Sequence, residues 1–283
     1  QSEQGGRYLL KYNNNIIVNI NRKIKLYKNF IWLDKKSLFK LINKNNLLNM
    51  DTISVFSCAV KKNIYDVPEK PLNKVYLWYK KLKKKYYIRV TLIPLLKLKK
   101  WKFDGIKIFD IKNKYFSIIG LKVFSNSREV SKWEQPIIRE KNIGLSGFII
   151  KKKNNTYHYL VSISVKPGLK NPTMSCTART SNLKGCLNDG NLNIIEKFYL
   201  KKYFIRNSSG KVRYNKTQSD EGGRFFKSQS KNVIIEIPAN EKIKINNNYI
   251  WMSHNQVLHF IKKGIFNIEA RILFACFNIK NIL

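Results

Sequence analysis

Residues 218–225 read QSDEGGRF, and the chain opens with nearly the same eight residues, QSEQGGRY, at residues 1–8. The match extends past this motif to three further pairs of segments: 15–20 with 232–237, 31–33 with 250–252, and 49–58 with 267–276. Similarity over such a long period indicates two copies of one structural module. We call residues 1–60 the first copy and residues 218–283 the second copy, and we expect them to fold alike.

The two copies do not have equal surroundings in the sequence. The second copy is preceded by residues 75–215, for which the first copy has no counterpart. Residues 61–74 contain Pro68 and Pro71 among charged residues, which is typical of a linker. We therefore expect residues 1–60 to be the C-terminal part of a truncated first module, residues 61–74 a linker, and residues 75–283 a complete second module.

Composition indicates a globular protein whose charge needs an explanation. With 43% hydrophobic and 13% aromatic residues, 283 residues can bury a sizeable core. A net charge of +38 is typical of nucleic-acid binding. However, only ten of the 55 basic residues are Arg, and Lys is accompanied by abundant Asn and Ile, as AT-rich coding would impose. Coding bias, a weak polyanion affinity and a selected nucleic-acid surface all stay open, and we expect no specific nucleic-acid partner.

The cysteines and apolar runs suggest a cytoplasmic protein. Cys58, Cys176, Cys186 and Cys276 form no CxxC pair and no zinc-type spacing, which favours core thiols in a reducing compartment. No apolar run approaches the roughly 18 residues of a membrane span, so we expect no membrane partner.

Local patterns predict an α+β fold, a mixed or antiparallel sheet with flanking helices. We expect helices after the N-caps Asp34 and Ser253, whereas the segments around residues 55–56 and 273–274 could be helix or strand. Trp32 and Trp251 are interpreted as core or interface anchors, and the lysine tracts 83–85 and 151–153 as exposed edges or hairpin tips. The expected strands are 15–20, 87–93, 106–111, 116–123, 145–150 and 157–165.

Three further motifs join the repeated one: REVSKWEQP at 128–136, KPG at 166–168 and PTMSCT at 172–177. In this order, with a closing N(M/I)(D/E) in each copy, the chain resembles the NDP-hexose 2,3-dehydratase family over essentially its whole length. The resemblance implies tandem Nudix-like modules, usually assembled as a homodimer. It also implies a hydro-lyase of deoxysugar and secondary-metabolite biosynthesis that removes water across C2 and C3 of an NDP-4-keto-6-deoxyhexose, typically dTDP-4-keto-6-deoxyglucose. The product would be a 3,4-diketo sugar nucleotide, which a separate ketoreductase reduces.

Such a reaction needs acid/base groups and hydrogen-bond donors but no cofactor and no metal. The 4-keto group acidifies the C3 proton, so the site needs a base there, donors for the enolate oxygen and an acid for the departing 2-hydroxyl. We expect the catalytic set to be Glu129, Glu221, Asp220 and Gln135. The sequence leaves open which carboxylate is the base.

Arginine and glycine in the motifs suggest the diphosphate contacts. Arg224, beside Gly222 and Gly223, is the first choice for this role and Arg128 the second, because the guanidinium fork binds two oxygens at once. The rest of the predicted substrate-binding set is Trp133 and Phe225 as stacking residues, with Thr177, Gln218, Asn267, Glu269 and Arg271.

Each of these assignments has a structural alternative. Arg128 and Glu129 could form a salt bridge, Gly222 and Gly223 a tight turn, and Asn267 and Glu269 a helix cap. The three histidines, His158, His254 and His259, lie in no catalytic or metal-binding pattern and are interpreted as structural.

The sequence departs from the Nudix pattern and, at a few positions, from the dehydratase pattern. Arg128-Glu129-Val130 matches only the middle of the Nudix box, where Lys132 and Trp133 replace carboxylates, so a metal-dependent hydrolase is excluded. From the dehydratase pattern, Lys166 stands where an acidic residue is usual, Met174-Ser175 replace Val-Gln, and Thr52-Ile53 replace the Ala270-Arg271 of the second copy.

The alternative function is a non-catalytic basic module that binds nucleotides or RNA. An enzyme predicts that Arg128, Glu129, Gln135, Glu221 and Arg224 converge in one pocket. An RNA-binding module predicts an exposed Lys/Arg stripe interleaved with aromatic residues.

Overall fold

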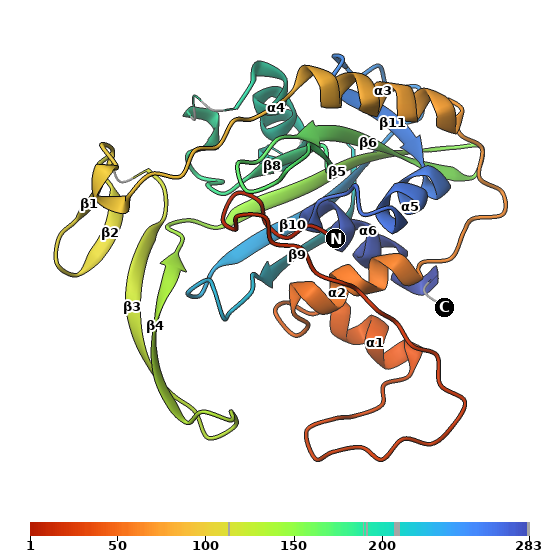
Figure 1. Ribbon diagram of the computed structural model, residues 1–283. Coiled ribbons are helices and arrows are strands. Elements are labelled where there is room, and N and C mark those ends of the chain that lie inside the picture. The colour runs from red at the N-terminus through yellow and green to blue at the C-terminus, as the bar shows by residue number, and fades with distance from the viewer. Residues whose placement is uncertain (113, 189, 191, 207–209, 282–283) are drawn as a thin grey trace.

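The computed structural model describes residues 1–112, 114–188, 190, 192–206 and 210–281. A mixed sheet lies at its centre (Figure 1), with β5 and β10 parallel and the other neighbouring strands antiparallel. Its strand order is β11 (Tyr249–Ser253), β6 (Thr156–Ser164), β5 (Gly144–Lys153), β10 (Gln229–Ile237) and β9 (Lys211–Ser219). Two short strands, β7 (Thr173–Ser175) and β8 (Ala178–Thr180), pair with β6 and β5. The expected α+β class is confirmed.

Helices cover both faces of this sheet. Because side chains alternate along a strand, Phe148 and Ile150 of β5 face one cluster of buried residues and Ile149 faces the other. The first cluster is closed by α1 (Lys35–Ile42), α2 (Met50–Phe56), α5 (His254–Lys262) and α6 (Ile268–Asn278). The second is closed by α4 (Ile194–Tyr199) and the π-helix Leu200–Ile205. Each fully buried Phe or Ile stabilises the fold by roughly 1.5–3 kcal/mol.

Polar caps start the helices where the sequence indicates. Asp34 caps α1 and Ser253 caps α5, so both predictions are confirmed. The ambiguous segments are the helices α2 and α6, and each begins at an asparagine. The Asn49 side chain accepts from Thr52 N at 2.9 Å, and the Asn267 side chain accepts from Ala270 N at 3.1 Å.

A second antiparallel sheet extends away from the first (Figure 1). Its strands are β1 (Trp101–Phe103), β2 (Lys107–Asp110), β3 (Ser117–Phe124) and β4 (Lys132–Arg139). Backbone bonds join it to the repeated motif, since Ile138 N donates to Arg224 O at 3.0 Å and Phe226 N donates to Ile138 O at 2.7 Å. The motif turn therefore connects the two sheets.

The remaining elements are short or lie at the periphery. They are the helix α3 (Leu72–Lys85) and the 3-10 turns Ser57–Ala59, Leu95–Lys97, Cys186–Asn188 and Ile279–Asn281. Of the expected strands, 106–111, 116–123, 145–150 and 157–165 are confirmed as β2, β3, β5 and β6.

Two expected strands are wrong. Residues 15–20 and 87–93 have irregular backbone, with side chains such as Ile16, Val18 and Leu92 more than 70% exposed. Both segments have strand-like residues, but neither is paired with a neighbouring strand in the structure. A strand needs such a partner to satisfy its backbone groups.

Two smaller expectations also need correction, and the predicted linker has defined contacts. Lys83–85 form the last turn of α3, where lysines suit the negative end of the helix dipole, and not a hairpin tip. Trp32 is 62% exposed, so it is no anchor, whereas Trp251 packs against the second cluster. Residues 61–71 are docked against α5, where Ser253 Oγ donates to Asp66 Oδ2 at 2.6 Å and Gln256 Nε2 donates to Lys70 O at 2.7 Å.

Within the described ranges, no helix is both long and apolar enough to cross a membrane. Within the part of the chain that the structure describes, no disulfide joins the four cysteines, and all but the half-buried Cys58 are buried.

Candidate functional site

A polar cavity of about 480 Å³ lies at one end of the main sheet. At this end β6 finishes, β5 and β10 begin, and α6 presents its first turn. The N-terminal loop, with Gln4, Gly6 and Arg7, forms another part of the wall. A cavity of this size is typical of small-molecule sites.

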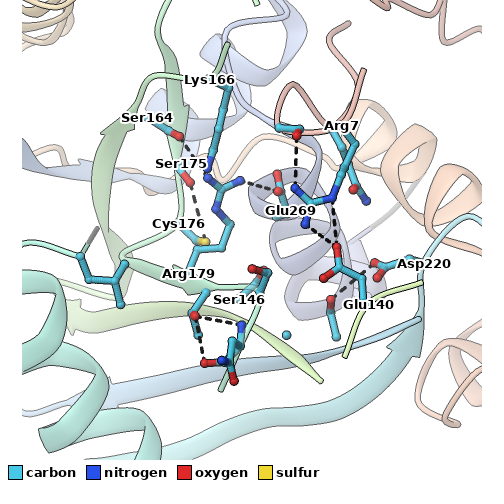
Figure 2. Close-up of a pocket in the computed structure, with 18 of the residues that line it drawn as sticks. Arg7, Glu140, Ser146, Ser164, Lys166, Ser175, Cys176, Arg179, Asp220 and Glu269 are labelled. Carbon is cyan, nitrogen blue, oxygen red and sulfur yellow. Dashed lines mark hydrogen bonds and ion pairs between the residues drawn. The ribbon is translucent and has the colours of Figure 1, made fainter. Parts of the chain in front are cut away.

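An ion pair crosses the cavity between Arg179 of β8 and Glu269 in the first turn of α6 (Figure 2). Arg179 Nη2 also donates to Ser164 Oγ at 3.3 Å. Burial alone would raise the pKa of Glu269, but the Arg179 guanidinium, a backbone hydrogen bond and the Lys166 ammonium together lower that pKa below its ordinary value. The N-terminal end of α6 favours the same charged form. Glu269 is therefore a fixed, ionised acceptor.

Asp220, which directly follows β9, has the opposite electrostatic environment. Burial raises its pKa, and the nearby carboxylates of Glu140 and Glu269 add to the effect. Its two oxygens accept hydrogen bonds from Ser228 Oγ at 2.7 Å and from Ser230 Oγ at 3.4 Å. A positioned carboxyl with a raised pKa is suited to proton transfer near neutral pH.

Arg7 brings a cation from the first copy into the cavity wall (Figure 2). Its guanidinium forms an ion pair with Glu140, with Nε donating to Oε1 at 3.0 Å, and lies 4.4 Å from the centre of the Phe116 ring. These contacts fix the orientation of the guanidinium fork. Sequence reasoning missed Arg7, although its position in the motif corresponds to that of Arg224.

Three of the predicted site residues line the cavity: Asp220, Glu269 and Thr177. Thr177 is fully buried, and its hydroxyl links two strands by donating to Leu160 O at 2.6 Å and accepting from Ile149 N at 2.9 Å. Arg179, Glu140 and Lys166 also line the cavity and were not predicted. Arg179 lies in an unrepeated part of the chain, so the duplication gave no signal for it.

Three other predicted residues are buried anchors outside the cavity lining. Gln218 donates to Tyr214 Oη at 3.0 Å, and Asn267 caps α6 and donates to Ser175 Oγ at 2.8 Å. Arg271 is only 1% exposed, and its guanidinium reaches three acceptors: Ser54 Oγ, Phe266 O and Ser2 O. It thereby ties the two copies together.

The remaining residues of the repeated motif form a turn beside the cavity. Glu221 accepts from Tyr8 Oη at 2.8 Å and lies 3.7 Å from Arg224, whose side chain is 59% exposed. Phe225 is buried with its ring edge against Tyr8. Gly222 and Gly223 are exposed, with open space where a Cβ would lie.

The predicted residues of β4 and the tip before it do not join the cavity. Trp133 Nε1 donates to Gln135 Oε1 at 2.7 Å, and Gln135 Nε2 donates to Gly223 O at 3.0 Å. Arg128 and Glu129 are exposed between β3 and β4. The structure therefore does not bring Arg128, Glu129, Gln135, Glu221 and Arg224 together in one pocket, and their expected roles stay predictions.

The three histidines lie outside the cavity lining and form contacts elsewhere in the fold. His158 and His254 contact the backbone carbonyls of Val67 and Lys61, and His259 contacts the Tyr76 hydroxyl. Among the residues that the structure describes, no three His, Cys, Asp or Glu side chains are grouped so that they could hold a metal ion.

The chain is therefore an α+β protein with a polar pocket. Arg7 and Arg179 are held in its wall by ion pairs, and it contains one carboxyl with a raised pKa, Asp220, and one with a lowered pKa, Glu269. The NDP-hexose 2,3-dehydratase family model matches residues 1–59 and 72–277, so the chain belongs to this family.

Curated relatives agree over nearly the whole chain. A dTDP-4-dehydro-6-deoxy-alpha-D-glucopyranose 2,3-dehydratase of Saccharopolyspora spinosa is 26% identical over 97% of this chain and 61% of its own length. Proteins of the same name from Amycolatopsis orientalis and Streptomyces violaceoruber are 28% and 27% identical over 98% of this chain, and 58% and 63% of their own lengths. The chain thus spans about 60% of the length of these relatives.

Similar solved structures are more distant. A C. elegans Ap4A hydrolase matches with a TM-score of 0.25 and 10% identity, over 44% of this chain and 87% of its own. An ADP compounds hydrolase matches with a TM-score of 0.34 and 13% identity, over 59% and 85%. At these scores the likeness supports no argument, and the tandem Nudix-like architecture stays a prediction.

Proposed function

We propose that the protein removes water across C2 and C3 of an NDP-4-keto-6-deoxyhexose, with dTDP-4-keto-6-deoxyglucose as the substrate to test first. The main support is that two carboxyls with opposite pKa shifts line the same cavity. The pKa of Asp220 is raised, and the pKa of Glu269 is lowered. Titratable groups with pKa values pushed apart indicate an acid and a charged partner in one site. The names of the three relatives support the same reaction.

The substrate would be oriented by the arginines of the cavity wall. We assign the diphosphate to Arg7, because its fork is fixed by Glu140 and Phe116 and lies at the part of the wall formed by the first copy. Arg179 then faces the sugar, where its charge stabilises the oxygen that becomes an enolate.

Asp220 is the acid that protonates the departing 2-hydroxyl. Its raised pKa keeps more of the protonated form at neutral pH than an exposed aspartate would have. Glu269 holds Arg179 in place through the ion pair. Positioned proton transfer of this kind contributes typically about 10²- to 10⁴-fold to a rate.

The broader setting of this activity is part of the same proposal. We assign residues 1–60 to the end of a first module, 61–74 to a connector and 75–283 to a second module. The protein would act as a cytoplasmic homodimer in deoxysugar and secondary-metabolite biosynthesis. Its 3,4-diketo product would be consumed by an NDP-sugar 3-ketoreductase.

The test is to incubate the full-length protein with dTDP-4-keto-6-deoxyglucose and a ketoreductase that traps the diketo product. The expected result is a sugar nucleotide without its 2-hydroxyl, detected by mass spectrometry as the loss of one water followed by reduction. Recovery of only substrate and its directly reduced form would overturn the proposal. Binding of RNA with no turnover would favour the alternative of a basic binding module.

A further inference from the structure

Lys166 lies in a backbone turn that is hydrogen-bonded to the N-terminal loop. It lies two residues beyond the end of β6, in the turn completed by Pro167 and Gly168. Gly168 N donates to Gly5 O at 2.7 Å, and Leu10 N donates to Gly168 O at 2.7 Å. A Cβ at Gly168 would lie 1.6 Å from Tyr8 O, so this close approach requires glycine. The turn therefore fixes where the Lys166 side chain begins.

The Lys166 side chain extends from this turn into the cavity and lies alongside the Arg179 guanidinium (Figure 2). It is half-buried, and in the described ranges its ammonium group makes no hydrogen bond or ion pair. A half-buried cation without an acceptor is costly, so such a lysine is a candidate for a functional group.

The charges around this ammonium favour its neutral form. The Arg179 guanidinium, then burial, lower the pKa of Lys166 to about 8. The other charged groups facing it are Glu269 of α6, Arg7 of the N-terminal loop and Glu196 of α4, and the two carboxylates act in the opposite direction. A substantial fraction of Lys166 is thus uncharged just above neutral pH.

We propose that Lys166 is the general base that removes the C3 proton of the substrate. This inference rests on the proposed function and adds a residue to it. Within the cavity, Arg7 and Arg179 stay protonated, and Glu269 is engaged by Arg179. Asp220 holds its proton more strongly than an ordinary aspartate and suits the role of acid. Lys166, whose side chain lies alongside Arg179 in the cavity, is a lining lysine that can give up and take back a proton near neutral pH.

The step balances with two groups of the cavity. The neutral Nζ of Lys166 takes the C3 proton, and the C3–H electron pair, held first as the enolate, forms the C2–C3 double bond. The C2–O bond breaks, and the hydroxyl leaves as water with the proton of the Asp220 carboxyl. In the tautomerisation that follows, the Lys166 ammonium returns a proton to C2 and the Asp220 carboxylate accepts the proton of the 3-hydroxyl. Both groups regain their starting states.

The test separates C3 proton removal from water loss by following deuterium entry at C3 in D₂O by NMR. In the wild type, exchange and dehydration should both occur, and exchange should speed up as pH rises through about 8. Asp220→Asn should keep exchange while dehydration falls. Lys166→Met should lose exchange about 100-fold or more, and Lys166→Arg should not restore it, because a guanidinium keeps its proton. The matched control is Lys170→Met, an exposed lysine of the same loop outside the cavity lining.

Several outcomes would overturn the inference. Exchange by Lys166→Met at the wild-type rate would show that another group is the base, and rescue by Lys166→Arg would show that only the charge matters. If Lys166→Met does not fold, Lys166→Cys alkylated with 2-bromoethylamine replaces the amine, and failure of that amine to recover exchange also contradicts the role. If the wild type dehydrates the substrate and Lys166→Met still exchanges the C3 proton at the wild-type rate, only this inference is refuted. A wild type that neither exchanges nor dehydrates refutes the proposed function with it.

Discussion

The two copies of the repeated motif form the same local hydrogen bonds. In each copy the motif glutamine donates through Nε2 to a cysteine of the closing helical segment and accepts through Oε1 from an asparagine. The residues are Gln1, Cys58 and Asn15 in the first copy, and Gln218, Cys276 and Asn232 in the second. The asparagine caps of α2 and α6 also correspond.

Beyond these local contacts the two copies differ. Residues 232–237 lie in β10 between β5 and β9, whereas residues 15–20 are irregular and largely exposed. Arg7 is fixed in the cavity wall, while Arg224 is 59% exposed at a surface turn. A short motif thus determines its own hydrogen bonds, but its sheet pairing and its access to the cavity depend on the surrounding chain.

The aligned carboxyls Asp220 and Glu3 should give the largest contrast in activity. Asp220→Asn removes the proposed acid, so kcat should fall by about 10²- to 10⁴-fold. Glu3→Gln should keep near wild-type turnover, because Glu3 does not line the cavity and accepts a hydrogen bond from Asn13. Steady-state kinetics of both variants checks the contrast. Equal losses would contradict the assignment of the active site to the second copy.

The aligned arginines test which copy supplies the diphosphate contact. Arg7→Met should raise KM by about 10- to 100-fold, which corresponds to the loss of a charge-assisted contact. Arg224→Met should leave KM close to the wild-type value, because its exposed side chain lies outside the cavity. The double variant Arg7→Met with Glu140→Gln controls for the carboxylate left unpaired. A larger KM effect at Arg224 would reverse the assignment.

The aligned glutamines test the shared hydrogen bonds through stability. Gln218 is 4% exposed and contacts Tyr214, Cys276 and Asn232, so Gln218→Leu leaves buried polar groups unpaired. We expect a loss of about 1–3 kcal/mol in the free energy of unfolding. Gln1→Leu should cost less, since Gln1 is only half-buried. Urea unfolding measures both, and a greater loss at Gln1 would contradict the comparison.

The smallest expected effect is a pH dependence of stability that both copies share. Burial raises the pKa of Asp220 and of Glu3 above their unfolded values. A carboxyl with a raised pKa gives stability below its unfolded pKa, and that stability is lost as pH rises through its folded pKa. As pH rises from 4 to 8, the Tm of the wild type should therefore fall relative to the Tm of the Asp220→Asn and Glu3→Gln variants. A wild-type Tm that rises relative to the variants over this interval would show that the pKa values of these carboxyls are not raised.

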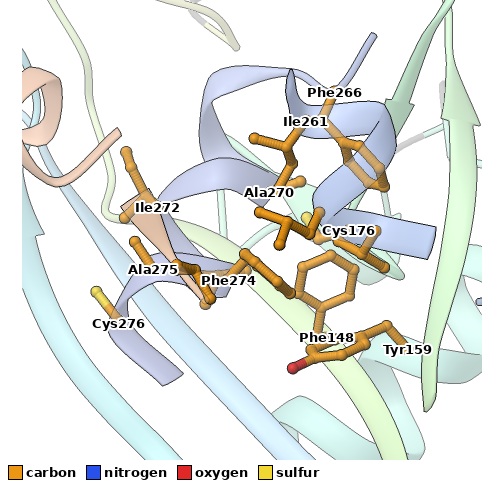
Figure 3. Packing of buried hydrophobic residues seen from close by; sticks show 14 of the residues in the cluster. Phe148, Tyr159, Cys176, Ile261, Phe266, Ala270, Ile272, Phe274, Ala275 and Cys276 are labelled. Atoms are coloured by element: carbon orange, nitrogen blue, oxygen red, sulfur yellow. The ribbon is translucent and has the colours of Figure 1, made fainter. Parts of the chain in front are cut away.

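Parts of the fold with strong local signals were predictable from the sequence. Asp34 and Ser253 mark helix starts because a short polar side chain there accepts from a backbone N–H of the first turn. The apolar runs of β5 and β6 indicate strands, and Phe148 and Tyr159 of these strands pack with Phe274 of α6 in the first cluster (Figure 3). Residues 15–20 have the same local character, but a strand also needs a neighbour, which their local sequence does not reveal.

The candidate site was predictable only in part for the same reason. Asp220 and Glu269 lie in motifs that both copies retain, so the sequence pointed to them. Arg179 and Glu140 come from unrepeated segments, and only the folding of the sheet brings them to the cavity. The prediction that residues 1–60 end a truncated module gives no reason to expect Arg7 at the site. Lys166 was noted only as a departure from the family pattern.

A crystal structure of the full-length protein with bound dTDP-4-keto-6-deoxyglucose, in an Asp220→Asn variant that slows turnover, tests the central claim most directly. We predict the diphosphate within hydrogen-bond distance of Arg7, and the C2 and C3 carbons of the sugar facing residue 220 and Lys166. A sugar bound at the exposed turn of residues 221–224, with the cavity between Arg7 and Arg179 left empty, would contradict this account.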